Sequence, residues 1–169
     1  MKKKVSRLLT AFLVTFCFIL GFSQLGYASD FQTQAIPGNP VYPGTNIKMK
    51  AGDVLYSSKG LDTYLVGHVG IVDANGQVIH MMKNGGMKRE SISAYSSNFK
   101  YTIYQAKVEN NGYKAAQNAT SLYNNYRSSA SYTLTTTLTR PKDKQYCTKL
   151  VWQAYYYGSN INLGDNSFT

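Results

Sequence analysis

Two strand-like segments, residues 67–73 and 77–82, constrain the fold of this chain more than any other part of it. Both are short and rich in valine, isoleucine and methionine, and only Ala74-Asn75-Gly76 separates them. Segments of this kind on either side of a glycine-containing turn are typical of an antiparallel β-hairpin. The chain is therefore expected to contain an antiparallel sheet.

The length of the hairpin turn decides where the two histidines of the chain, His68 and His80, lie. A two-residue turn would put them on opposite faces, because side chains alternate along a strand. A three-residue turn with Gly76 left-handed pairs Asp73 with Gln77 and makes the histidines diagonal neighbours on one face. The other face then holds an aliphatic set suited to a core: Val69, Ile71, Ile79 and Met81. This pattern favours the longer turn.

With the longer turn, His80 faces Gly70 and His68 faces Met82 across the hairpin. Gly70 has no side chain and leaves room for the imidazole of His80, although a strand glycine beside a bulge is the alternative reading. We therefore expect the two imidazoles to lie within reach of each other.

One of the two cysteines, Cys147, lies far downstream of the histidines. A thiol nucleophile needs a nearby base, and the base needs a partner that orients its ring. Cys147, His68 and His80 supply one residue for each role. Any one of them alone is more simply a buried structural residue, but together they favour a catalytic site.

Residues 144–157 are expected to form a helix with Asp143 as its N-cap and Cys147 in its first turn. The residues on the same face as Cys147 are apolar and should pack inward: Leu150, Val151, Ala154 and Tyr155. The positive end of the helix dipole favours a thiolate at this position. Backbone N–H groups there also point toward a developing oxyanion.

Residues 1–28 have the pattern of a signal peptide cleaved near Ala28. Four basic residues precede an apolar stretch, Leu8 to Phe22, that is short for a membrane span of roughly 20 residues. Cleavage would remove Cys17 and leave no stable membrane span, whereas an uncleaved anchor is the alternative. We expect the product to be secreted or associated with the cell wall.

Without residues 1–28, the formal net charge falls from +10 to +6 and one cysteine remains, so no internal disulfide can form. The basic residues are scattered, which argues against nucleic-acid binding and leaves either an anionic wall or membrane surface or a plain soluble surface. No zinc-ligand spacing and no phosphate-binding glycine loop occurs. We expect a monomer that needs no metal and no cofactor.

The rest of the chain suits one domain over residues 51–169. Residues 29–50 are expected to be an extended lead-in rather than a packed element. Residues 101–108 alternate like a strand, 113–127 have helical spacing, and 128–139 are expected to form a loop or an edge strand. Asp53 is expected to cap the turn into the first strand.

Three motifs together resemble the permuted NlpC-type papain-like cysteine hydrolases, with the YiiX and YebB branch nearest. They are Gly52-Asp53-Val54-Leu55, Gly67-His68-Val69-Gly70-Ile71-Val72, and the run from Tyr146 to Tyr155. In this chain the histidine precedes the cysteine, as in the permuted group and in relatives of lecithin retinol acyltransferase. The resemblance covers roughly residues 50 to 163.

The resemblance implies an α+β fold, with a small antiparallel sheet or barrel packed on the helix that carries the nucleophile. By position, it implies Cys147 as nucleophile, His68 as base, and His80 as the group that holds the His68 ring. The backbone N–H of Cys147 would help to stabilise the oxyanion.

The sequence thus predicts an exported cysteine hydrolase that cleaves amide bonds. A lysine-rich signal peptide, typical of Gram-positive bacteria, favours peptidoglycan stem peptides or a similar peptide as substrate. A thioesterase or acyltransferase acting on lipid acyl groups is a second hypothesis, which an apolar tunnel beside Cys147 would favour. A catalytically inactive wall-binding protein is the third, since the run Tyr155-Tyr156-Tyr157 could stack on sugars, although at least one of these tyrosines could instead pack in the core.

Overall fold

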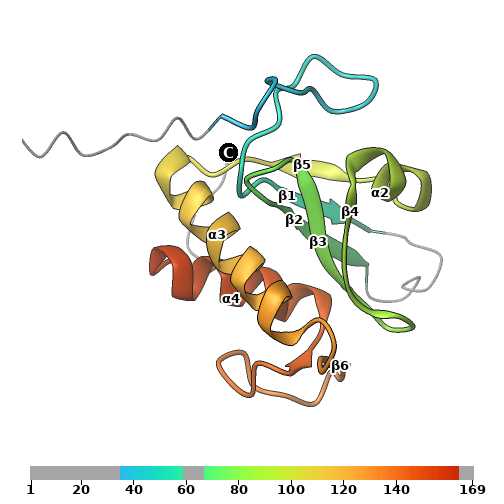
Figure 1. Ribbon diagram of the computed structural model, residues 1–169, viewed down its shortest axis with the longest axis vertical. Coiled ribbons are helices and arrows are strands. Elements are labelled where there is room, and N and C mark those ends of the chain that lie inside the picture. Colours follow the sequence, from blue (N-terminus) through green and yellow to red (C-terminus); the bar gives the residue numbers. More distant parts are fainter. Residues whose placement is uncertain (1–34, 59–66, 164–169) are drawn as a thin grey trace, which may run out of the picture. The chain divides into compact units, whose positions relative to one another are not determined.

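The computed structural model describes residues 35–58 and 67–163 (Figure 1). The signal peptide expected over residues 1–28 lies outside these residues, as does the start of the 29–50 segment. In the part of the chain that is described, no helix has the length and apolar character needed to cross a bilayer.

Five strands form one antiparallel sheet in the order β4-β3-β2-β1-β5. The strands are β1 (Val54–Ser57), β2 (His68–Val72), β3 (Gln77–Met82), β4 (Gly86–Ser91) and β5 (Thr102–Tyr104). Among the described residues, three helices accompany this sheet: α2 (Ile92–Asn98), α3 (Glu109–Tyr126) and α4 (Cys147–Ser159). The expected mixed α+β fold with an antiparallel sheet is confirmed.

The β2–β3 hairpin has the longer of the two turns considered. The backbone N–H of Asp73 donates to the carbonyl of Gln77 at 2.8 Å, and Gly76 has a φ of +76°. The Asp73 carboxylate also accepts hydrogen bonds from the N–H groups of Asn75 and Gln77, at 2.8 and 2.9 Å. An aspartate that bonds the backbone two residues ahead stabilises such a turn, which explains why the three-residue form is adopted.

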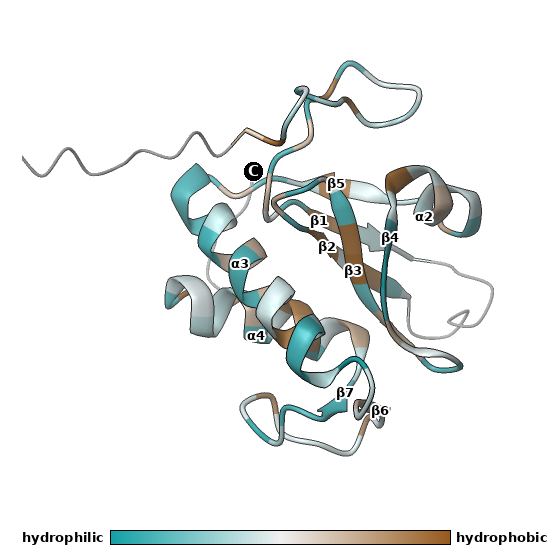
Figure 2. Cartoon of the chain, viewed as in Figure 1, coloured by the Kyte–Doolittle hydropathy of each residue, from teal (hydrophilic) through white to brown (hydrophobic). Residues whose placement is uncertain are grey.

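The two faces of the sheet are covered by different helices (Figure 1). Side chains on one face pack with α3 and α4 in a cluster that includes Val69, Ile71, Ile79, Met81 and Leu150. The opposite face packs with α2 in a second cluster that includes Leu55, Val72, Val78, Tyr95 and Phe99. Because both faces are buried, β2 and β3 are apolar along most of their length (Figure 2).

The helix boundaries differ from those expected. α3 begins at Glu109 rather than at residue 113, and α4 begins at Cys147 rather than at residue 144. The prediction that Asp143 caps α4 is wrong: the N-cap is Tyr146, and no side chain makes a capping hydrogen bond. The reason is that Lys144–Gln145 forms β7, which pairs in parallel with β6 (Ser131–Tyr132) and keeps the chain extended up to the cysteine.

The expectation that residues 29–50 form an extended lead-in is also wrong, because the described part of this segment packs onto the domain. Ile36, Tyr42 and Met49 are buried in the α2-side cluster. The Tyr42 hydroxyl donates to the Asp53 carboxylate at 2.7 Å, and Asp53 also accepts from the Lys50 N–H at 2.9 Å. The expectation that Asp53 caps its turn is confirmed, and the same carboxylate ties the preceding segment to the sheet.

Candidate active site

The β2–β3 register brings the two imidazoles together. Gly70 pairs with His80 in the ladder, as predicted, so His68 and His80 lie diagonally on one face. Nε2 of His68 and Nδ1 of His80 are 2.8 Å apart, a hydrogen bond whose direction depends on the tautomers. The prediction that the two histidines share a face and touch is confirmed.

Gly70 is required by this packing. A Cβ atom at this position would lie 2.6 Å from Cγ1 of Val78, 3.3 Å from Cε2 of Tyr95 and 3.4 Å from Cβ of His80. No side chain fits without moving its neighbours, because a Cβ contact under 3.0 Å is a clash. The lack of a side chain at Gly70 therefore lets Tyr95 and His80 pack close to the strand, and the glycine does not mark a bulge.

Aromatic rings cover both imidazoles. Phe99 stacks on His68 with ring centroids 4.3 Å apart and an interplanar angle of 20°, and Tyr95 meets the His80 ring edge-on at 5.2 Å. Each histidine is only 1% exposed. Burial lowers the pKa of His68 to about 4. Burial, with smaller contributions from His68 and Lys88, lowers the pKa of His80 to about 3. Both rings are therefore neutral at pH 7.

Glu90, on β4, is a neighbour of the pair that sequence reasoning missed. Its Oε1 lies 3.1 Å from Nε2 of His80, within ion-pair distance, although the angle does not meet that of a hydrogen bond. Burial raises the pKa of Glu90, while Lys88 opposes that shift. The signal that could have located it is the Asn84-Gly85-Gly86 turn, which returns β4 alongside β3.

The order of these contacts indicates which imidazole nitrogen is free. An ionised carboxylate only accepts, so Glu90 favours a proton on Nε2 of His80 and a lone pair on its Nδ1. That lone pair accepts from Nε2–H of His68. Nδ1 of His68 is then left with a lone pair, and this buried atom has no hydrogen-bond partner among the residues that the structure describes. His68 is thus arranged as a proton acceptor at Nδ1.

Cys147 is the first residue of α4, as the sequence predicted for a first-turn position. Its thiol is 5% exposed and lies in the cluster on the α3–α4 side, among apolar side chains that include Val69, Met81, Leu150 and Val151. Within the described residues, the polar contact of Sγ is with Oγ1 of Thr148 at 3.9 Å. The predicted inward face of the helix is confirmed, since Leu150, Val151, Ala154 and Tyr155 are all buried.

The thiol and the imidazoles are not in direct contact. Cys147 packs on the α4 side of the sheet, whereas His68 and His80 contact Tyr95 and Phe99 on the other face. Tyr95 nevertheless connects them electrostatically: burial raises its pKa, and the charge of a Cys147 thiolate adds to the rise.

A comparison with protein-family models identifies relatives of the chain. Residues 9–167 match the family described as "Lipoprotein N-acylation protein LnsA-like". The chain belongs to this family. The matched region includes Cys147, His68, His80 and Glu90. The match supports membership of the LnsA-like family. It does not specifically support the NlpC-type assignment.

Other comparisons add little to the LnsA-like assignment. No curated protein matches the chain. A solved structure, that of the metalloprotein yiiX from Escherichia coli O157:H7, is 17% identical with a TM-score of 0.48, over 66% of this chain and 67% of that one. Among the described residues of the LnsA-like chain, no three His, Cys, Asp or Glu side chains are grouped so that they could hold a metal ion.

Proposed function

We propose that this protein is a thiol-dependent acyltransferase that acts in lipoprotein N-acylation, with Cys147 as the nucleophile. The observation that carries the proposal is the match of residues 9–167 to the LnsA-like lipoprotein N-acylation family. The apolar surroundings of the thiol support it: Cys147 belongs to a core cluster with Val69, Met81 and Leu150, and apolar surroundings favour an acyl chain over a charged peptide. Methionine adapts to such a chain, since its thioether is flexible.

The chemistry follows from the atoms present. With Nδ1 of His68 taking the thiol proton, Sγ of Cys147 attacks the carbonyl carbon of an acyl ester, and the alcohol leaves with that proton. The acyl group is then held as a thioester. An amine attacks the thioester carbonyl, an amide forms, and the sulfur leaves as a thiolate that recovers a proton through His68. No oxidant or cofactor enters this balance.

The neighbouring groups have supporting roles in this proposal. His80 holds the His68 ring, and Glu90 favours the tautomer that leaves Nδ1 of His68 free to accept a proton. The backbone N–H of Cys147, in an uncapped first turn, donates to the oxyanion. This proton transfer requires a rearrangement, because Cys147 packs in the cluster on the α3–α4 side whereas the His68 ring packs against Tyr95 and Phe99 in the α2-side cluster.

Two alternatives use the same residues. With a peptide amide as the acyl donor, an amine as the leaving group and water as the acceptor, the site would be the cell-wall peptide amidase expected from a permuted papain-like fold. A thiol that never reacts would indicate an inactive binding scaffold. Export through the signal-peptide pattern of residues 1–28 suits each of these, and it would bring the enzyme to the membrane surface where lipoproteins are anchored.

The decisive experiment looks for the acyl-enzyme. The full chain is incubated with phospholipid vesicles of one defined acyl composition, and its intact mass is measured before and after neutral hydroxylamine, which cleaves thioesters. The proposal expects a gain of one acyl chain that hydroxylamine reverses, and transfer of that chain to an added peptide amine. Cys147→Ser and His68→Ala should abolish the gain, whereas Cys17→Ser serves as the matched thiol control and should keep it.

Other outcomes discriminate among the alternatives. Cleavage of muropeptides with no acylation from lipids would support the amidase. If neither lipid nor muropeptide reacts, alkylation of Cys147 by iodoacetamide is measured across pH in the chain and in His68→Ala. A thiol that reacts like free cysteine in both proteins would contradict any enzymatic role.

A further inference from the structure

The loop between β6 and β7, residues 133–143, is held in place by buried polar side chains. Lys149 of α4 is fully buried, and its ammonium donates to Oγ1 of Thr136 at 3.0 Å and to the carbonyl of Pro141 at 2.7 Å. A buried lysine is costly unless its donors are satisfied, and here the loop satisfies them. The loop and the helix are therefore stabilised together.

Two buried glutamines extend this support. Nε2 of Gln153 donates to the carbonyls of Leu138 and Thr139, at 2.8 and 3.2 Å. Nε2 of Gln145 donates to the carbonyl of Lys142 at 2.7 Å and to Oε1 of Gln153 at 2.8 Å. Both glutamine side chains are inaccessible to solvent. Connected networks of this kind rigidify the segment that they hold, so the loop has a defined shape.

This well-anchored loop exposes apolar side chains to water. Leu134 is 58% exposed and Leu138 is 39% exposed. Figure 2 shows apolar positions on the loop interrupted by hydrophilic ones. A single exposed leucine is ordinary, but this rigid loop exposes two. Neither leucine is needed for the packing of the loop. The polar network holds the backbone without using either side chain.

Basic residues lie in the same loop as the two leucines, and one of them contacts an aromatic ring. Arg140 and Lys144 are exposed, and Lys142 lies over the ring of Tyr157 with its ammonium 4.6 Å from the centroid. Asp143 is the one acidic residue within 133–144. Leucines, cations and tyrosines side by side are the composition of segments that sit at the interface of anionic membranes.

We propose that the β6–β7 loop docks on an anionic lipid bilayer, with Leu134 and Leu138 among the acyl chains and Arg140 and Lys142 at the phosphates. The complementary charge singles out an anionic lipid surface as the partner. Docking deepens the proposed acyl transfer by naming the surface from which the acyl donor comes, and for that purpose it rests on the proposed function.

The position of the loop suits this role. Its two ends meet where Tyr132 pairs with Gln145, two residues before Cys147. Burial raises the pKa of Tyr132, and the charge of the Cys147 thiolate adds to it, so the base of the loop lies near the thiol. A docked loop would bring the nucleophile close to the lipid carbonyls without burying a helix in the membrane.

The test reads the environment of the loop directly. The full chain carrying Cys17→Ser, Cys147→Ser and Leu138→Cys is labelled with an environment-sensitive fluorophore and mixed with phosphatidylglycerol vesicles. The matched control carries the label at Val108→Cys, a position 55% exposed just before α3. Both proteins contain the same apolar N-terminal stretch, so any anchoring by it is common to the two.

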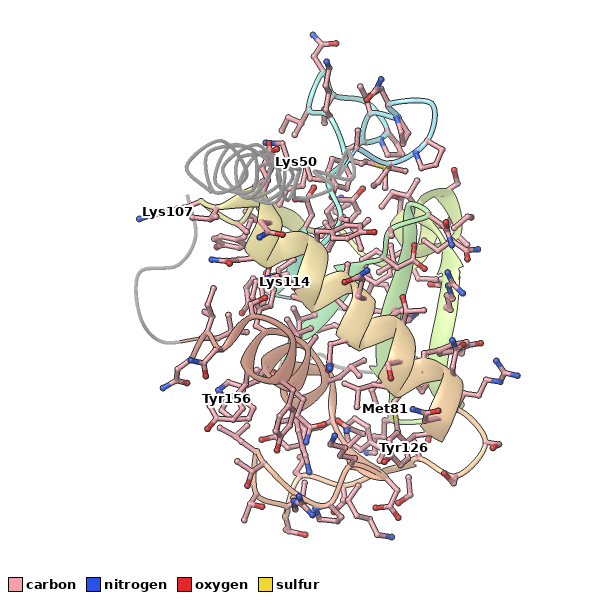
Figure 3. All side chains as sticks on the ribbon, turned by 60° about the vertical axis from the view of Figure 1, so that its left-hand side comes forward. Lys50, Met81, Lys107, Lys114, Tyr126 and Tyr156 are labelled. Atoms are coloured by element: carbon pink, nitrogen blue, oxygen red, sulfur yellow. The ribbon has the colours of Figure 1, made fainter. Side chains whose placement is uncertain are left out.

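The proposal expects a blue shift and quenching by brominated lipid for the label at position 138 and not for that at position 108. Arg140→Gln with Lys142→Gln should weaken vesicle affinity about thirtyfold, because each cation contributes about fivefold at an anionic surface. Lys107→Gln with Lys114→Gln removes the same charge elsewhere and should have little effect. Figure 3 shows Lys107 far from the loop, near the start of α3.

Three results would overturn the docking proposal. The label at position 138 could stay in water, both labels could respond equally, or a response could require a lipoprotein in the vesicles, which would make the partner a protein. Because every labelled sample carries Cys147→Ser, acyl transfer does not contribute to the signal. Insertion without transfer by the native chain would therefore contradict the proposed function alone.

Discussion

The burial of two neutral imidazoles makes the stability of this protein depend on acid in a way that can be worked out. Unfolding exposes His68 and His80, whose pKa values rise from about 4 and about 3 to their ordinary value of 6.5. The unfolded chain then binds more protons than the folded one between these folded pKa values and about pH 6.5. Stability is complete above that pH and is lost as the pH falls toward the folded values.

The size of the loss follows from the width of this window. At pH 5, an unfolded imidazole lies 1.5 pH units below its ordinary pKa of 6.5 and is mostly protonated, while both folded rings are still neutral. Each unit corresponds to about 1.4 kcal/mol, so each histidine lowers the free energy of unfolding by about 2 kcal/mol between pH 7 and pH 5. The pair lowers it by about 4 kcal/mol, a large share of the stability of a domain.

The assay is urea unfolding at pH 7 and pH 5 for the native chain, His68→Gln and His80→Gln. Each variant should lose about 2 kcal/mol of the pH dependence, whatever its absolute stability. Asp53 and Glu90 have pKa values raised by burial, which gives the opposite sign, but all three proteins share them. Ile79→Val, in the other core cluster, is the control that should lower stability by about 1 kcal/mol with an unchanged pH dependence.

One result would refute the reasoning outright. An equal pH dependence in all variants would contradict the burial of the imidazoles.

Two further predictions concern the same face of the sheet. Gly70→Ala should destabilise the protein by about 1–3 kcal/mol in urea unfolding, because the new Cβ would lie 2.6 Å from Cγ1 of Val78, and a change under about 0.5 kcal/mol would show that this face can relax. Glu90→Gln should slow thioester formation roughly tenfold or more by releasing the His80 tautomer, while Glu109→Gln, which removes an exposed carboxylate at the start of α3, keeps the native rate and tests for a general charge effect.

Much of the sheet and of the histidine pair could be predicted from local patterns. The alternation of β2 and β3 and the Ala74-Asn75-Gly76 turn determine the register, and the register determines that His68 and His80 touch. The helical spacing around Cys147 likewise predicted which residues of α4 point inward. These features depend on neighbours close in sequence, so local rules are sufficient for them.

The errors have a common cause in contacts between distant segments. The Asp143 cap was wrong because β6, from a separate segment, pairs with β7 and holds the residues before Cys147 extended. The expectation of an extended lead-in was wrong because the Tyr42 hydroxyl donates a hydrogen bond to the buried carboxylate of Asp53. Neither partner can be recognised from the local sequence, since each pairing is chosen by the packing of the whole domain.

The sequence by itself determined the hairpin register, the adjacency of the two imidazoles and the position of Cys147 at the start of a helix, because periodicity and turn chemistry act over a few residues. Only the tertiary structure decided that Glu90 lies beside His80, that the thiol packs on the α4 side among apolar side chains, and that Lys149, Gln145 and Gln153 hold the β6–β7 loop. These features depend on which groups hydrogen-bond to buried polar atoms and on which side chains pack together in the core. They depend on segments that cover the sheet and are distant in sequence, so local patterns do not identify them.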